Sequence, residues 1–182
     1  MNSIRVPLRR AYRLLHPKLV TVIGASAHGE TNFMPASWVM PASFDPPLLV
    51  AAVGEERYTL GLILDSGEMT VNPVGPNLIP LVEELGSLSG READKASLAG
   101  TLAAEKVSAP CLPGALACIE ARLRSTHPAG DHVLVVAEVV AARAWRCFDA
   151  ETHAYREGCG PVYHVGGHTY MEPGRYVEWG HR

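Results

Sequence analysis

The stretch ACIEARLRSTHPAGDHVLVVAEVVAARA, residues 117–144, decides the fold class. Apolar and polar residues alternate from Ala117 to Arg124, as in a strand that has one face in the core. The turn residues of 128–131 follow, and 132–144 return as a nearly uninterrupted apolar run. We therefore expect two long antiparallel strands of the kind that line a β-barrel.

The chain on both sides of this stretch has the same character. Short apolar runs rich in β-branched residues predict strands, and Gly and Pro mark the breaks between them. The strands are expected at 19–26, 32–44, 48–54 and 68–74, with a last hairpin at 162–170. Short helices are expected at 57–64 and, capped by Asn77 and ended by Gly86, at 78–85, followed by a polar loop at 87–95. These elements predict a single mainly β domain over residues 1–182, a barrel of about six to eight strands with a few short helices.

Composition excludes several functional classes. Nineteen acidic residues against sixteen Lys and Arg give a formal charge of −3, which does not suit a binder of the nucleic-acid backbone. No apolar run approaches the roughly 18 residues of a membrane span, so we expect no membrane association. The start of the chain lacks the apolar segment of a secretory signal, so we expect a cytoplasmic location. The arginine-rich start of the chain is expected to form a short strand or helix that caps the barrel with solvated arginines.

Four cysteines stand at positions 111, 118, 147 and 159, with no C-x-x-C pair. This spacing fits neither a zinc ribbon nor a thioredoxin-like motif. We therefore expect four reduced thiols in a cytoplasmic protein, no bound metal, and little loss of stability on their removal.

Motifs of several common enzyme classes are absent from the sequence. No G-x-G-x-x-G follows a predicted strand, and no phosphate-binding G-x-x-x-x-G-K-[ST] occurs. In GSLSG, residues 86–90, Leu88 stands where a nucleophile elbow needs serine. Dinucleotide-binding domains of the Rossmann type, P-loop ATPases and α/β-hydrolases are therefore excluded.

Six short motifs in order resemble one known family. They are NFMPASWVMPASFDPP (32–47), RYT (57–59) after the strand at 48–54, VNP (71–73), SGREADK (89–95), GDH (130–132) and VYHVGGHTY (162–170). Together they resemble the flavin reductase-like, FMN-binding split-barrel family, which includes the flavoredoxins, over roughly residues 12–170. Pro73 departs from the commonest pattern and removes a backbone donor there.

The resemblance implies a homodimer with one FMN per subunit in a groove at the dimer interface. Cations, hydroxyls and an amide would hold the phosphate: Arg57, Thr59, Ser89, Gly90 and Lys95. An apolar wall and a few donors would hold the flavin ring: Asn32, Met34, Ser37 and Trp38. By the same resemblance His132 lies near the flavin, and Tyr163 or Tyr170 closes the other face of the ring.

The resemblance also implies an activity, which is NAD(P)H-dependent reduction of flavin and transfer of electrons to a small-molecule or protein acceptor. The flavin itself accepts the hydride, so no side chain is expected to be catalytic, although His132 could have a positioning role. Two alternatives stay open. One is a flavoredoxin-type electron carrier that takes its electrons from a protein, and the other is a haem- or ligand-binding module of the same barrel without redox activity.

Overall fold

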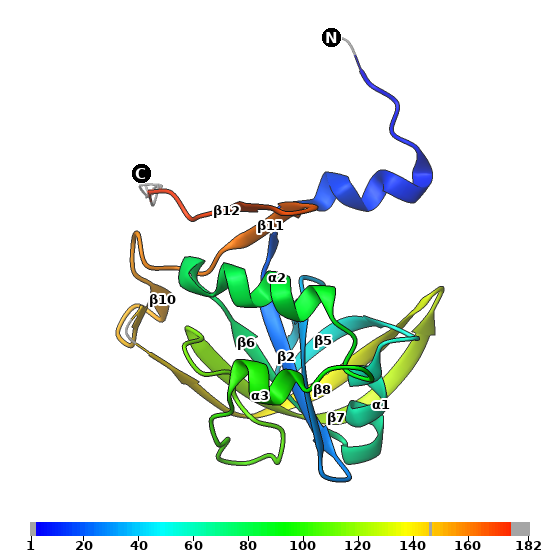
Figure 1. The fold of residues 1–182 in the computed structure, drawn as a ribbon. Helices are drawn as coiled ribbons and strands as arrows, with labels where there is room; N and C mark the ends of the chain where they lie inside the picture. The colour runs from blue at the N-terminus through cyan, green and yellow to red at the C-terminus, as the bar shows by residue number, and fades with distance from the viewer. Residues whose placement is uncertain (1–2, 146, 176–182) are drawn as a thin grey trace.

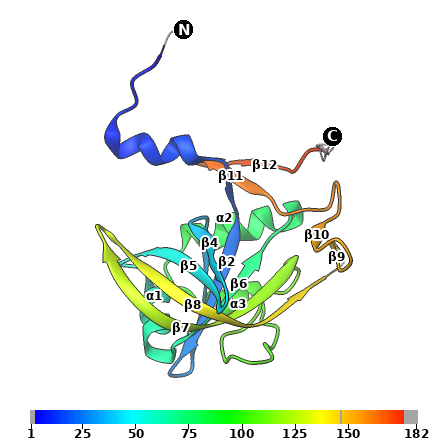
Figure 2. The same cartoon turned by 180° about the vertical axis from the view of Figure 1, so that it is seen from behind.

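One antiparallel sheet of seven strands curls into a barrel (Figures 1 and 2). The computed structural model describes residues 3–145 and 147–175. The strands follow the order β3-β2-β6-β7-β8-β5-β4 across the sheet. Their bounds are β2 Thr21–Ala27, β3 Glu30–Ala36, β4 Val39–Phe44, β5 Pro47–Gly54, β6 Glu68–Pro73, β7 Ala117–Ala129 and β8 His132–Ala144. The two end strands, β3 and β4, are joined directly through Ser37 and Trp38.

The predicted pairing of the two long strands is confirmed. Strands β7 and β8 are antiparallel, from the pair Ala117 and Ala144 to the pair Ala129 and His132. Strand β7 extends through Pro128, so the turn is shorter than expected and lies at Gly130 and Asp131. The predicted run at 32–44 is two strands, because the chain leaves the extended ladder at Ser37 and Trp38.

Within residues 3–145 and 147–175, three α-helices and two 3-10 helices accompany the sheet. They are α1 Tyr58–Ser66, α2 Ile79–Ser87, α3 Lys95–Ala99, η1 Leu8–Leu15 and η2 Pro76–Leu78. Asn77 lies inside η2 and does not cap α2, which begins after Leu78. The short helix α3 replaces the end of the predicted polar loop, and Asp94 caps it by accepting a bond from the Ser97 amide at 2.9 Å. Among the described helices, none is long and apolar enough to cross a membrane.

Two apolar clusters fill the molecule. The first contains the inward face of the strands together with Leu60, Leu62 and Ile63 of α1. The second packs Val22 and Phe33 against Leu85 of α2. Because α1 and α2 belong to different clusters, the space between the first turn of α1 and the end of α2 is left for the groove described below.

The C-terminal part contributes to two small sheets. One contains β1 Lys18–Leu19, β11 Tyr163–Gly166 and β12 Thr169–Met171, and the other contains β9 Phe148–Asp149 and β10 Ala154–Tyr155. The predicted last hairpin is confirmed as β11 and β12, and β11 also pairs with β1. The Glu83 carboxylate of α2 accepts a bond of 2.5 Å from the Tyr170 hydroxyl and one of 2.6 Å from His168 Nδ1. These bonds hold the hairpin to α2. They also lower the pKa of Glu83, and the bond from Tyr170 has a larger effect than the bond from His168.

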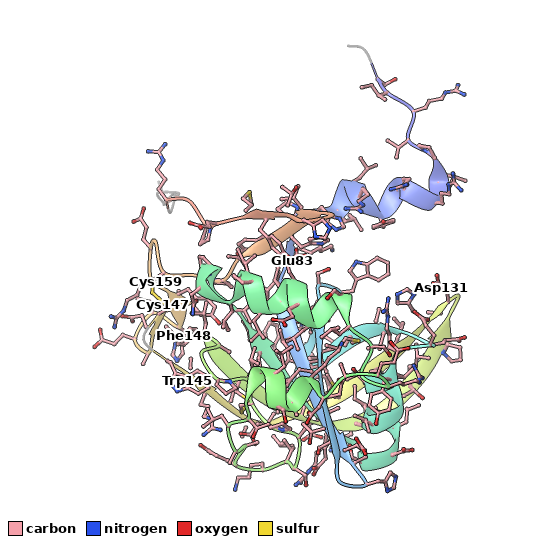
Figure 3. All side chains as sticks on the ribbon, in the orientation of Figure 1. Glu83, Asp131, Trp145, Cys147, Phe148 and Cys159 are labelled. Atoms are coloured by element: carbon pink, nitrogen blue, oxygen red, sulfur yellow. A yellow bond between two sulfur atoms is a disulfide. The ribbon has the colours of Figure 1, made fainter. Side chains whose placement is uncertain are left out.

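The prediction of four free thiols is wrong. Cys111 and Cys118 form a buried disulfide, and Cys147 and Cys159 form a second one. Figure 3 shows Cys147 and Cys159 together beside Phe148, on the side of the molecule opposite Asp131. The inference of a reducing compartment loses the support that it drew from free thiols.

Glu120 explains why the first disulfide could not be recognised from spacing. Its buried carboxylate accepts bonds from the backbone amides of Glu105 at 2.9 Å and Lys106 at 2.6 Å. This carboxylate folds the segment before Cys111 back onto β7, where Cys118 lies. The pairing therefore depends on a loop return and on no local motif.

We expect alkylation of the unfolded, unreduced protein to modify no cysteine, and alkylation after reduction to modify all four. The double variant Cys111→Ala, Cys118→Ala should lower the free energy of unfolding by about 2–4 kcal/mol, because the unfolded chain gains freedom and the folded core loses its crosslink. Mass spectrometry and urea unfolding measure the two effects. Alkylation of four cysteines without reductant would contradict the assignment.

Candidate functional site

A groove of about 570 Å³ opens between β3, the start of α1 and the end of α2. Ten of the twelve predicted site residues line it, although they come from four separate stretches of sequence. They are Asn32, Met34, Ser37, Trp38, Arg57, Thr59, Ser89, Gly90, Lys95 and His132. The structure thus brings together residues that were selected only by their motifs.

Lys95 is a buried cation in the wall of this groove. Only 4 % of the residue is exposed, and its ammonium donates a bond of 2.6 Å to the Leu85 carbonyl at the end of α2. Within the part of the chain that the structure describes, no carboxylate forms an ion pair with it. Burial lowers the pKa of Lys95, and repulsion from Arg57 lowers it further. A buried charge in this state is stabilised by an anion.

The first turn of α1 adds further donors on the same side. Arg57 is the N-cap residue of α1, and no side chain caps this end of the helix by a hydrogen bond. The unpaired amides and the helix dipole of such an N-terminus favour an anion. The Arg57 guanidinium is mostly exposed and is 3.2 Å from Glu56, so it can turn toward a ligand.

Asn32 and Thr59 form a buried polar pair next to Gly90. Asn32 Nδ2 donates a bond of 2.8 Å to Thr59 Oγ1, which leaves the hydroxyl proton of Thr59 for another acceptor. Asn32 Oδ1 is buried and has no partner among the described residues. A Cβ at Gly90 would lie 2.5 Å from that oxygen and 2.6 Å from the Tyr58 ring. Glycine therefore keeps this end of the groove open.

Aromatic side chains form the opposite end. The rings of Trp38 and His132 are stacked, with centroids 5.0 Å apart and planes 26° apart. Asp131, at the tip of the β7–β8 hairpin (Figure 3), accepts a bond of 2.6 Å from His132 Nδ1. That bond lowers the pKa of Asp131 and fixes the orientation of the imidazole. Met34 lines the same groove and packs against the barrel core.

Tyr163 and Tyr170 do not line the groove. Tyr163 pairs with Leu19 of β1, and Tyr170 packs at the second cluster and donates its hydroxyl bond to Glu83. Within the described chain both tyrosines therefore have structural contacts in the C-terminal sheet. Their predicted position over a flavin stays a prediction.

Tyr58 and Arg91 line the groove and lie within the motifs, but they were not among the predicted site residues. Arg91 donates a bond of 3.0 Å to the Glu56 carbonyl, and its guanidinium lies 5.6 Å from the centre of the Tyr58 ring. Their positions inside RYT and SGREADK were the available signal, and only the folded loop shows that they touch.

The groove thus combines a cationic end with an aromatic end. The donors of Lys95, Arg57 and Thr59 suit a phosphate group, whose negative charge would neutralise the buried ammonium of Lys95. Trp38 and Met34 suit a flat apolar ring. The buried Asn32 Oδ1 suits a hydroxyl donor between the two. A phosphate ester of a planar ring, such as FMN, fits these residues.

Comparison with known proteins agrees with this geometry. The family described as "Flavin reductase like domain" matches residues 12–167. An uncharacterized protein of Aeropyrum pernix is 34% identical over 141 residues, which cover 75% of this chain and 53% of that protein. The chain therefore spans about half the length of that relative. The reductase component of 4-hydroxyphenylacetate 3-monooxygenase of Thermus thermophilus is 33% identical over 64% of this chain and 70% of its own length.

Solved structures match over nearly the whole chain. An FMN-binding protein from Thermus thermophilus, solved with bound 1-cyclohex-2-enone, has a TM-score of 0.87 at 31% identity and covers 99% of this chain and 100% of its own. Flavoredoxin from Methanosarcina acetivorans has a TM-score of 0.88 at 23% identity, with 98% and 95% covered, which shows the shared fold. The predicted fold class, a mainly β split barrel, is confirmed.

We expect Gly90→Ala to lower the free energy of unfolding by about 1–3 kcal/mol, because the new methyl group overlaps Asn32 and the Tyr58 ring. Gly61→Ala in α1 is the matched control, because a Cβ there meets open space and alanine favours a helix. Urea unfolding of both variants measures the difference. Equal stability of the two variants would show that the groove does not need glycine at position 90.

Proposed function

We propose that this chain, which belongs to the flavin reductase-like family, binds FMN in the groove and reduces an acceptor with electrons from NAD(P)H. The observation that carries the proposal is the buried ammonium of Lys95, which has no anionic partner among the described residues. A phosphate carries about two negative charges and would satisfy it. The names of the relatives support flavin as the phosphate ester.

The phosphate would lie at the cationic end. Lys95 and Arg57 supply positive charge. Thr59 supplies its hydroxyl proton, and the first amides of α1, which no side chain caps, supply further donors. Asn32 is bonded to Thr59, which favours a contact with the ribityl hydroxyls over the ring contact that the sequence predicted. Ser89 holds the loop by accepting the Arg91 amide at 3.3 Å, and the Gly90 amide lies beside it.

The planar ring would lie at the aromatic end, against Met34, with the Trp38 indole at the rim of the groove beside it. When bound, FMN supplies a hydride acceptor and links a two-electron donor to an acceptor. The chain's own residues then bind, orient and shield the ring. His132, held by Asp131 and stacked on Trp38, fixes the wall of the groove beside it.

The two rival candidates keep the same groove and differ in their electron source or ligand. Anaerobic mixing of the FMN-loaded protein with NADH or NADPH separates them. Rapid loss of the visible flavin band supports the reductase, and an unchanged spectrum supports a carrier that takes electrons from a protein. A colourless protein that takes up haem and not FMN contradicts the proposal.

We also propose that the chain is a homodimer. The edge strand β4 exposes Met40 and the whole of Phe44, and η1 exposes Leu8 and Leu15. Apolar side chains of this size on a sheet edge and a projecting helix fit an isologous interface. Light scattering should give about twice the chain mass of 19.6 kDa, and Phe44→Asp should shift it to the single mass. A single-chain mass for the unmodified protein would contradict the homodimer.

We expect Lys95→Met to raise the dissociation constant of FMN about 10- to 150-fold, because a charge-assisted phosphate bond is lost. Methionine keeps the length of the side chain and removes a desolvated charge, so thermal unfolding should show a folded variant. Lys106→Met, at an exposed lysine outside the groove, is the matched control. Titration of each apoprotein with FMN measures the effect, and unchanged affinity in Lys95→Met would overturn the phosphate assignment.

A further inference from the structure

Six aromatic side chains form a continuous row from the groove to the C-terminal hairpin. Neighbouring ring centroids are 5.0 to 5.8 Å apart. The row runs in the order His132, Trp38, Tyr12, His16, His164 and Tyr170. Its members come from four distant parts of the chain: the helix η1, the β3–β4 connection, the start of β8 and the hairpin β11–β12.

The helix η1 is attached to the body mainly through this row. Figures 1 and 2 show it beside β11 and β12, away from the barrel. None of its residues is buried, and Leu8 and Leu14 are 92% and 70% exposed. It contacts the body through the Tyr12 ring, the His16 ring next to it, and a bond of 3.4 Å from Arg13 Nη1 to the Val165 carbonyl. The helix therefore directs Tyr12 and Arg13 toward the body and its leucines outward.

Trp38 links this helix to the groove. The Tyr12 and Trp38 rings are in an edge-type contact, with centroids 5.6 Å apart and planes at 65°, and His132 stacks on Trp38. Trp38 lines the groove and is 39% exposed, so part of the indole remains available to a ligand. Two rings, those of Tyr12 and His132, thus hold the indole at the rim.

We propose that Trp38, positioned by Tyr12, selects planar ring compounds as the electron acceptor. The inference rests on the proposed function. An indole face that is held at a groove rim favours a flat ring by stacking and offers nothing comparable to a compact inorganic ion. The N-terminal helix is thereby a specificity element of the site, and Tyr12 is a positioning residue.

Menadione is a suitable probe, because it is a flat quinone and its reduction balances with the proposed donor. One quinone takes the hydride of one NADH and one proton from solvent, giving one hydroquinone and NAD⁺. Ferricyanide is the contrasting acceptor, because it is an octahedral ion that takes one electron at a time and cannot stack. Two ferricyanide ions are consumed for each NADH, with release of one proton.

The first test is equilibrium dialysis of menadione against the oxidised, FMN-loaded protein without any electron donor. We expect Tyr12→Ala to raise the dissociation constant of menadione about 3- to 10-fold. Tyr12→Phe keeps the ring and should retain the original affinity. Leu14→Ala changes an outward residue of the same helix and should also retain it. The second test is steady-state kinetics, in which Tyr12→Ala should lower the menadione-to-ferricyanide ratio of kcat/KM by a similar factor through the KM of menadione.

The outcomes separate this inference from the proposed function. Failure of the unmodified protein to bind FMN, or to be reduced by NADH and NADPH, overturns the proposed function. Normal FMN binding and reduction with equal menadione affinity in Tyr12→Ala overturns only the inference. A Tyr12→Phe variant as weak as Tyr12→Ala also overturns it, because the hydroxyl that accepts a bond from Arg13 would then matter in place of the ring.

Discussion

The hydrogen bond between the Lys95 ammonium and the Leu85 carbonyl connects the fold to the function. Leu85 lies in the last turn of α2, where carbonyls lack helical partners and the helix dipole favours a cation. The bond joins the last turn of α2 to the start of α3 beside the groove. It leaves a desolvated positive charge, since Arg57 adds repulsion and no acidic side chain in the described chain neutralises it. The local structure thus holds a desolvated positive charge that a bound phosphate would stabilise.

The sequence predicted the barrel well because strand patterns are local. The alternation in β7 and the apolar run of β8 specify which faces are buried, and this pairing required no distant information. Most of the groove followed from residues at strand and helix ends, where motifs keep their spacing. Contacts between motifs could not be predicted. The bond of Asn32 with Thr59 depends on how β3 packs beside α1, and the contact of Arg91 with Tyr58 depends on how the 88–94 loop closes. The bond from Tyr170 to Glu83 could not be predicted for the same reason, because the two residues are 87 positions apart.

The cysteines show a second limit of sequence reasoning. Counting and spacing recognise metal sites and small disulfide scaffolds, whose pairs lie in known patterns. Here one pair closes a loop that a buried carboxylate has already folded, since Glu120 binds two backbone amides before Cys111. An acidic residue in a predicted strand gave no sign of this role, because its alternation fitted a solvent-facing position. Glu120 is buried because the long connection between α3 and β7, which contains Glu105 and Lys106, covers it.

The helix η1 reverses the usual amphipathic arrangement, and its inward side contacts the aromatic end of the groove. A surface helix normally buries its apolar stripe, but η1 exposes leucines and contacts the body through rings and an arginine. Such weak attachment makes sense if each face has a separate partner: the leucines a second subunit, and Tyr12 the indole at the groove rim. The cationic end then selects by charge, which is strong and indifferent to shape. The aromatic end selects by shape, which is weaker, so its position must be held from outside the barrel.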